Sequence, residues 1–258
     1  MKKKQPTINF TNKRILITGG TRGIGYATTK AFLVAGARVA LNGRSESSVN
    51  NALAELKAGD NAIGVVGDVS TVDNCNEIVR QAIEQLGGLD VLVNSAGVFY
   101  IKSVTDTDES TWDTMFDINV KGTFYCCRAA QAELTASAGS IINLSSQAGL
   151  EGYTNIAAYC ASKAAVINMT RAMALEFAPN VRVNSICPGF IDTDMTHSAL
   201  SNEGEDKADL SEAADSYPLK RLGTAEEIAT SILYLASEHA AFITGSALSI
   251  DGGGTAGR

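Results

Sequence analysis

The 258-residue sequence has few of the residues that build disulfide frameworks and metal sites. It contains five cysteines, an odd number, and none of them stands in a Cys-x-x-Cys spacing. The two histidines, His197 and His239, lie far from one another and from any cysteine pair. This composition argues against a disulfide-stapled domain and against a thiolate metal site. We therefore expect reduced, mostly buried thiols, structural or surface histidines, and no metal.

The sequence also lacks a long apolar run and an excess of basic residues. No uninterrupted apolar stretch approaches the roughly 18 to 20 residues that cross a bilayer. The basic start Met1–Lys4 is followed by Gln5–Asn9, where a signal peptide would need an apolar core. Lys and Arg number 21 against 28 Asp and Glu, a net charge of −7, so no nucleic-acid or anionic-membrane surface is expected. The composition predicts a cytoplasmic protein that acts on a small molecule.

A glycine-rich turn lies near the start of the chain, between a strand pattern and a helix pattern. The β-branched run Arg14–Thr18 precedes the turn, and a helical pattern follows it over Tyr26–Val34. Glycines in such a turn let the backbone approach a pyrophosphate, and the helix N-terminus presents free N–H groups to the anion. On its own the turn could also be a plain helix start. We expect a dinucleotide to contact Gly19, Thr21, Arg22, Gly23, Ile24 and Gly25.

The next strand pattern, Arg38–Asn42, ends where the adenosine ribose of a dinucleotide should arrive. An acidic residue there would accept hydrogen bonds from a ribose 2′-hydroxyl, whereas this sequence offers Arg44 and Ser45, with Arg22 from the glycine turn. These residues favour NADP(H) as the cofactor. The alternative is that Arg44 only solvates a loop.

Strand and helix patterns alternate along the rest of the chain. Further strands are expected at 62–66, 89–93, 140–144 and 181–186, with a helix over 73–86. This order predicts an α/β, doubly wound parallel sheet, a Rossmann fold, in a single domain over 1–258. Residues 13–105 would mainly bind the cofactor and 106–258 would carry catalysis and substrate. Ends of the third and fourth strands, which plain turn chemistry would also explain, supply further expected cofactor contacts: Asp68, Val69, Asn94, Ala96 and Gly97.

The stretch Tyr159–Lys163 stands near the start of a long helical pattern. A spacing of four places the phenol and the ammonium on one helix face. A unit charge about 6 Å away, at an effective dielectric of about 20, favours the phenolate by about 2.8 kcal/mol, which predicts a phenol that titrates near 8. Such a group can serve as an acid–base catalyst. Alone, the pair could equally be a half-buried Tyr above a solvated Lys.

Two further polar features accompany that pair. The helical pattern over Asp108–Glu133 carries Asn119 in its interior, where an Asn competes for backbone hydrogen bonds and needs a reason to be present. The strand at 140–144 delivers Ser145 and Ser146 to the carboxyl edge of the sheet.

These motifs together resemble the short-chain dehydrogenase/reductase family, in its single-domain, NADP-preferring branch, over essentially the whole chain. Its Thr-Gly-x-x-x-Gly-x-Gly is matched by 18–25, its Asn-x-Ala-Gly by 94–97 and its Pro-Gly-x-x-x-Thr by 188–193, while 243–253 resembles its terminal strand. Ser95 departs from the second Asn usual in the family. The resemblance implies a catalytic set of Asn119, Ser146, Tyr159 and Lys163; Ser146, thirteen residues before Tyr159, is favoured over Ser145.

The resemblance also implies roles around this set. Tyr159 would be the general acid–base, Lys163 would lower its pKa and hold the nicotinamide ribose, and Asn119 would anchor a water. The cofactor would also contact Tyr159, Lys163, Pro188, Gly189, Ile191 and Thr193. The substrate would contact Ser146, Gln147, Tyr153, Tyr159, Phe190 and Met195.

The stretch 194–217 is polar, acidic and weakly patterned, directly after the expected nicotinamide contact. We interpret it as a substrate lid, with a plain surface insertion as the alternative. The helix Ala225–Ala236 and the last strand resemble the surfaces through which the family forms homotetramers.

The expected activity is an NADPH-dependent reduction of a small or medium neutral ketone. Within the family the sequence resembles the 3-oxoacyl-(acyl-carrier-protein) reductases, which dock their acidic carrier on basic residues before the fifth strand. Here Gln131–Ala138 has no Lys or Arg, which argues against carrier docking. A 3-oxoacyl-(acyl-carrier-protein) reductase is therefore the alternative to the expected activity. A non-catalytic dinucleotide-binding regulator is a second alternative, which would need a broken catalytic set, and the set is intact.

Overall fold

The computed structural model describes residues 8–201 and 210–257, and its strands form a seven-stranded parallel sheet in the order β3-β2-β1-β4-β5-β6-β7. The strands are β1 Arg14–Thr18, β2 Arg38–Gly43, β3 Ala62–Val66, β4 Val91–Asn94, β5 Ser140–Leu144, β6 Arg182–Pro188 and β7 Ala247–Ile250. The α-helices are α1 Gly23–Val34, α2 Glu46–Leu56, α3 Val72–Leu86, α4 Glu109–Phe116, α5 Thr123–Ser137, α6 Ala157–Glu176, α7 Asp194–Leu200, α8 Ser211–Asp215 and α9 Ala225–Ala236. A π-helical segment, Asp117–Gly122, joins α4 to α5. The predicted doubly wound α/β fold in a single domain is confirmed.

The strands are apolar throughout because helices cover both faces of the sheet. Side chains alternate along a strand, so Ile15 and Ile17 pack with Phe32 of α1 on one face. Leu16, between them, packs with Ile78 of α3 on the other. This two-sided burial is typical of a parallel sheet built from βαβ units.

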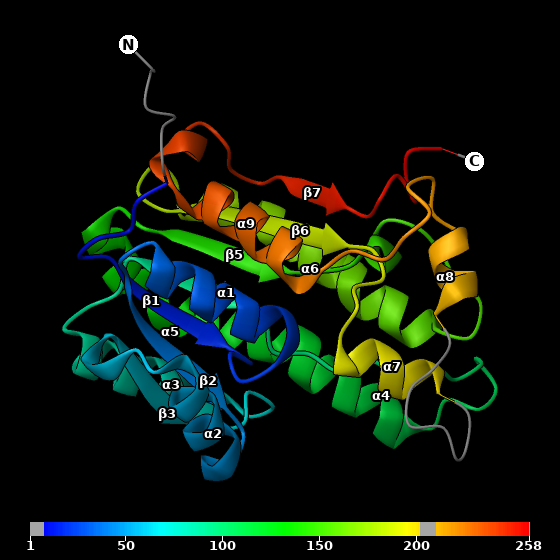
Figure 1. Cartoon of the computed structure of the whole chain (residues 1–258), viewed down its shortest axis with the longest axis horizontal. Helices are drawn as coiled ribbons and strands as arrows, with labels where there is room; N and C mark the ends of the chain where they lie inside the picture. Colours follow the sequence, from blue (N-terminus) through cyan, green and yellow to red (C-terminus); the bar gives the residue numbers. More distant parts are fainter. Residues whose placement is uncertain (1–7, 202–209, 258) are drawn as a thin grey trace.

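The strand order reverses at β1, which lies between β2 and β4. Register pairs Ile15 of β1 with Val39 of β2 on one side and with Val91 of β4 on the other. In Figure 1 the arrowheads of the strands point to the same side of the molecule, toward α7 and α8. A reversal of this kind opens a crevice at the carboxyl ends of the strands, which is where ligands bind to open α/β sheets.

Three local features differ from the predicted elements. Helix α2 was not predicted; Ser45 begins it by accepting a hydrogen bond from the Ser48 N–H. Strand β4 begins at Val91, two residues after the predicted start, and Asp90 just before it is held to Arg14 by an ion pair of 2.8 Å to Nε. The predicted helix over 108–133 is divided by the π-helical segment. At its last residue, Gly122, a Cβ would lie 2.9 Å from the carbonyl oxygen of Val69, which precedes α3.

The described residues also bear on membranes and metals. No helix among them is long and apolar enough to cross a bilayer. Within the described ranges no three His, Cys, Asp or Glu side chains gather where they could hold a metal ion.

Candidate active site

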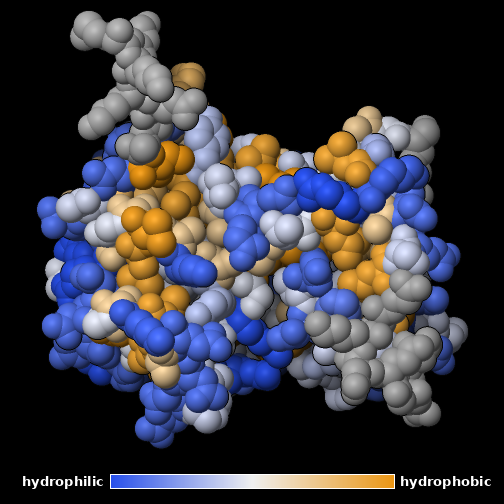
Figure 2. All heavy atoms as spheres, viewed as in Figure 1, coloured by the Kyte–Doolittle hydropathy of each residue, from blue (hydrophilic) through white to orange (hydrophobic). Residues whose placement is uncertain are grey.

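A cavity of about 390 Å³ lies at the carboxyl ends of the strands, at the reversal of strand order. Figure 2 shows the recess near the middle of this face, between the surface over α1 and the surface over α7. It is lined by residues from the turn after β1, the ends of β2 to β6 and the start of α7. A volume of this order suits a small-molecule or cofactor site.

The turn after β1 has the shape of a phosphate cradle. Gly19 has φ +64°, and a Cβ there would lie 2.8 Å from the Ala96 Cα, so only glycine fits between β1 and β4. A Cβ at Gly25 would lie 2.1 Å from the Gly19 carbonyl oxygen, which lets α1 start against the turn. No side chain of the described residues caps the N-terminus of α1. Its first N–H groups are therefore available to an anion, and a pyrophosphate fits this cradle.

The adenosine end of the cavity carries two arginines. Arg22 and Arg44 both line the cavity and are exposed, and neither forms an ion pair with a described residue. The Ser45 hydroxyl is instead used at the start of α2, where it also donates to Ser48 Oγ at 3.0 Å. Ser48, which was not predicted, lines the cavity beside them. The β2 end is thus positively charged and suits an additional phosphate.

Of the two predicted cofactor contacts Asp68 and Asn94, Asp68 lines the cavity and Asn94 does not. Asp68 lines the cavity and its Oδ1 accepts from the Ser70 N–H at 2.9 Å. Asn94 is buried and turned into the sheet, where its Nδ2 donates to Asn143 Oδ1 at 2.9 Å. The Asn94 side chain thus joins two neighbouring strands and does not line the cavity, and the cofactor contact at this position stays a prediction.

The structure brings the predicted acid–base residues together on the floor of the cavity. The Lys163 ammonium lies 5.6 Å from the centre of the Tyr159 ring, one turn away on α6. Ser146, at the end of β5, lies close enough to the Tyr159 phenol to lower its pKa. Lys163 Nζ donates to the Leu144 carbonyl at 3.0 Å. Phe99 packs on the Tyr159 ring with centroids 4.7 Å apart, a contact that no sequence motif indicated.

The electrostatics of this pair differ from the prediction. Burial raises the pKa of Tyr159 to about 12, and the Ser146 hydrogen bond offsets only part of that effect. Burial lowers the pKa of Lys163 to about 8. The predicted phenol titrating near 8 is wrong, because that expectation counted the attraction of the ammonium and left out the cost of taking both groups out of water. At neutral pH the phenol holds its proton and the ammonium is mostly charged.

The two adjacent serines have separate tasks. The Ser145 hydroxyl is buried and donates to the Lys163 carbonyl at 2.8 Å, tying β5 to α6. Ser146 Oγ accepts from the Ala148 N–H at 3.1 Å, at the start of a 3-10 turn over Gln147–Gly149. The Ser146 proton therefore remains free to donate, toward the phenol or toward a substrate oxygen.

Asn119 lies inside the π-helical segment and does not line the cavity. Its Oδ1 accepts from the Val98 N–H at 2.9 Å, and its Nδ2 donates to the Val98 carbonyl at 3.0 Å and to Ser162 Oγ at 3.1 Å. The side chain thus joins the segment after β4 to helix α6. A Cβ built on Gly97 would touch both Asn119 Oδ1, at 3.2 Å, and Lys163 Nζ, at 3.6 Å, so these two groups approach the same spot. A π-bulge at a functional position is a recurrent arrangement.

Apart from Asn94 and Asn119, every predicted site residue lines the cavity. Pro188, Gly189, Ile191 and Thr193 follow β6, and Gln147, Tyr153, Phe190 and Met195 stand at the substrate end. The sequence reasoning missed several lining residues that carry no motif of their own: Asn42, Ser48, Ser95, Val98, Phe99, Ile118, Ile156, Asp194 and Thr196. It also missed a task of Thr18, whose Oγ1 accepts from the N–H groups of Ser95 and Ala96 at 3.2 Å each.

The chain is similar to known proteins over nearly its whole length. A family model described as enoyl-(acyl carrier protein) reductase matches residues 19–255. The chain is 40% identical to 2-(S)-hydroxypropyl-CoM dehydrogenase 3 of Xanthobacter autotrophicus, over 95% of this chain and 97% of that protein. It is 37% identical to a 3-oxoacyl-(acyl-carrier-protein) reductase of Chlamydia muridarum, over 94% and 97%. A crystal structure from Brucella melitensis, described as a short-chain dehydrogenase/reductase of the glucose/ribitol dehydrogenase type, superposes with a TM-score of 0.88 at 35% identity, covering 95% and 97%.

Proposed function

The chain belongs to the short-chain dehydrogenase/reductase family, and from that premise we propose that it is an NADPH-dependent oxidoreductase that interconverts a neutral ketone and a secondary alcohol. The observation that carries the proposal is the Ser146–Tyr159–Lys163 constellation on the floor of a cavity with a phosphate cradle. The arrangement supports reduction at neutral pH, because burial keeps the phenol protonated, with its pKa at about 12.

In this proposal Tyr159 donates its proton to the carbonyl oxygen as that oxygen gains negative charge. Ser146 donates a hydrogen bond to the same oxygen, since its own acceptor side is already used by the Ala148 N–H. The Lys163 ammonium stabilises the phenolate that remains, at 5.6 Å from the ring centre. Asn119 holds the segment around Gly97 against α6, which fixes the distance between these groups. The nicotinamide cofactor supplies the hydride when bound.

The preference for NADPH rests on the β2 end of the cavity. Arg22 and Arg44 line it, and the strand end has Gly43 where an acidic residue would exclude a 2′-phosphate. A guanidinium provides a planar, charged set of donors that matches a phosphate.

A neutral substrate is favoured by the residues at the other end of the cavity. Tyr153, Ile156, Phe190 and Met195 are apolar or aromatic, and Gln147 supplies an uncharged amide. Among the described lining residues, the basic side chains are Lys163 and the two arginines at the cofactor end. An anionic substrate group would find no basic partner among the described residues at this end, where Asp194 is the charged side chain next to Met195.

The homotetramer implied by the family resemblance remains part of the proposal. Tyr234 of α9 and Phe242, beside the edge strand β7, are exposed large side chains. Exposed apolar groups near an edge strand are suited to burial in an assembly.

The test is Tyr159→Phe, which keeps the ring and removes the proton. Turnover of ketones with NADPH should fall by about 10² to 10⁴-fold, while the dissociation constant for NADPH, measured by fluorescence, should stay within a few-fold. Tyr100→Phe is the matched control, because Tyr100 is partly exposed and lies outside the cavity lining. Tyr159→Phe turnover close to that of Tyr100→Phe would exclude the acid–base role.

A further inference from the structure

Tyr217 lies where the chain returns from the predicted lid, and its phenol is buried, with 4% of the residue exposed. Its oxygen accepts two hydrogen bonds, from the Phe190 N–H at 2.7 Å and from Gln147 Nε2 at 2.8 Å. Both partners line the substrate end of the cavity, whereas Tyr217 does not. One buried oxygen therefore connects two segments of the substrate wall that are far apart in sequence.

Gln147 depends on this contact for its orientation. The bond to Tyr217 is the only hydrogen bond of the Gln147 side chain to a described residue, and its Oε1 is buried without a partner among them. An amide held at one atom only is free to rotate once that contact is lost.

Two glycines pack closely against the Tyr217 side chain. A Cβ at Gly189 would lie 2.9 Å from the Tyr217 hydroxyl oxygen, and a Cβ at Gly254 would lie 2.9 Å from its Cε1. The Leu219 N–H donates to the Gly252 carbonyl at 3.2 Å, which ties the C-terminal run to the same place. In Figure 1 that run, after β7, passes beside the segment that follows α8. Such close approaches fix the ring in one position.

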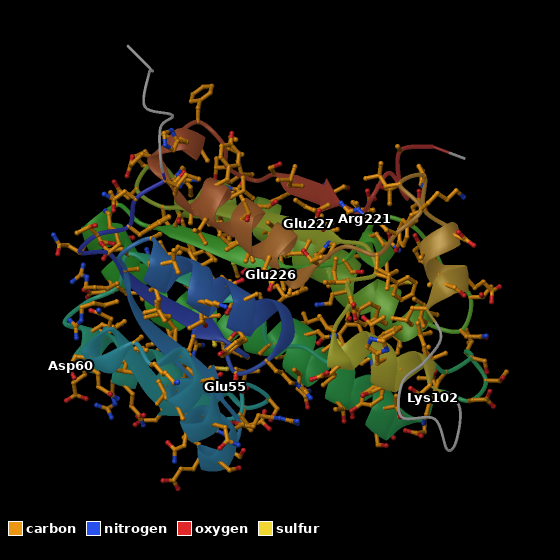
Figure 3. All side chains as sticks on the ribbon, viewed as in Figure 1. Glu55, Asp60, Lys102, Arg221, Glu226 and Glu227 are labelled. Carbon is orange, nitrogen blue, oxygen red and sulfur yellow. The ribbon has the colours of Figure 1, made fainter. Side chains whose placement is uncertain are left out.

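Both ends of the predicted lid are thereby attached to the chain that follows β6. At the outgoing end, Thr196 Oγ1 donates to the Ile191 carbonyl at 2.6 Å. At the returning end, Tyr217 binds the Phe190 N–H. Beyond it, Arg221 pairs with Glu227 at the start of α9, where the two side chains lie next to one another in Figure 3. The middle of the predicted lid, 202–209, lies outside the described residues.

We propose that Tyr217 is a positioning residue for substrate selection: its phenol oxygen sets the side-chain amide of Gln147 and the main chain of Phe190, and so the shape of the substrate end. The inference rests on the proposed ketone reductase function. Tyr217 does not touch the reacting atoms, so its effect passes through Gln147 and Phe190. Its loss changes which ketone is preferred more than it changes the chemical step.

The test compares Tyr217→Phe with Tyr234→Phe, a matched removal of a hydroxyl from a partly exposed tyrosine of α9. Removing the acceptor leaves two donors without a partner, so KM for the preferred ketone should rise about 10-fold. The ratio of kcat/KM between a small and a bulky ketone should also change by about that factor, with NADPH binding unaltered. A merely structural role would scale both ketones equally and leave that ratio unchanged.

Gln147→Met provides a second route to the same contact. It should shift the ketone preference in the same direction. The double variant should shift it no further than the larger single change, since the hydrogen bond between Gln147 and Tyr217 is lost in either variant. Additive shifts, or an unchanged ratio in both variants, overturn the proposal.

Hydrogen exchange at the Phe190 amide is a readout that needs no turnover. It should be about 10-fold faster in Tyr217→Phe and unchanged in Tyr234→Phe. Faster exchange in a protein whose wild type reduces no ketone refutes the proposed function and supports the positioning of Phe190. Unchanged exchange together with wild-type ketone preference refutes the inference alone.

Discussion

Replacing Lys163 by Met should stabilise the fold while abolishing most activity, and the gain should depend on pH. Lys163 is 5% exposed, and burial lowers its pKa from 10.5 to about 8. The unfolded chain therefore binds this proton more tightly than the folded protein does. Lys163 therefore lowers the free energy of unfolding at every pH where the unfolded side chain is charged. The full cost applies below about pH 8, the folded pKa, and it disappears as the pH rises through 10.5, the unfolded pKa.

The magnitude follows from the two pKa values. The difference between the two pKa values corresponds to about 3 kcal/mol of destabilisation at pH 7. At pH 9.5 the folded side chain has lost its proton, whereas most unfolded chains still carry theirs, so the cost falls to about 1 kcal/mol. The advantage of Lys163→Met over wild type should thus be about 2 kcal/mol larger at pH 7 than at pH 9.5. Loss of the Lys163 bond to the Leu144 carbonyl lowers the gain at both pH values and largely cancels in the comparison.

The assay is denaturation of both proteins at the two pH values. A difference of about 2 kcal/mol corresponds to roughly 4 to 8 °C in Tm for a chain of this size. Lys30→Met is the control, because Lys30 is exposed on α1 and its removal should change stability equally at both pH values. A Lys163→Met advantage that is the same at pH 7 and pH 9.5, or larger at pH 9.5, would refute the reasoning from burial.

Three further predictions concern catalysis, cofactor and substrate. Ser146→Ala should lower kcat about 10² to 10³-fold, whereas Ser145→Ala should mainly lower Tm, because its hydroxyl binds the Lys163 carbonyl; equal kinetic effects would contradict this division. Arg44→Ser should reduce the kcat/KM preference for NADPH over NADH by about 10-fold or more. Gly43→Asp should reverse that preference only together with Thr21→Ala, since a Cβ at position 43 would lie 2.6 Å from Thr21 Cγ2. Equal kcat/KM for both cofactors in the wild-type protein would exclude the NADPH assignment. Acyl groups on a carrier protein should be no better substrates than the same groups on a short neutral thioester, and a carrier advantage that fades with salt would reverse this expectation.

The carrier prediction has a specific structural basis. Helix α5 has no basic residue over Gln131–Ala138, as the sequence indicated, but it carries Arg128 one turn earlier. That guanidinium lies over the Tyr125 ring, 4.7 Å from its centre. A single arginine already engaged with an aromatic ring is a weak basis for docking an acidic carrier.

The sequence by itself determined the features that depend on a few neighbouring residues. The apolar runs marked strands β1 to β6 to within two residues, and glycine spacing marked the cradle after β1. The four-residue spacing from Tyr159 to Lys163 already implied that their side chains share one face of α6. These patterns are legible because helix and strand periodicity and turn chemistry are local properties.

Only the tertiary structure decided the features that depend on packing between distant segments. It buried Lys163, partly buried Tyr159 in the cavity wall, and so moved both pKa values away from the ones that an exposed helix would give. It turned Asn94 from the cavity toward Asn143, and it seated the Tyr217 phenol between Phe190 and Gln147, seventy residues away. Burial and hydrogen-bond partners are set by what the folded chain places around a group, and no spacing along the sequence records that environment.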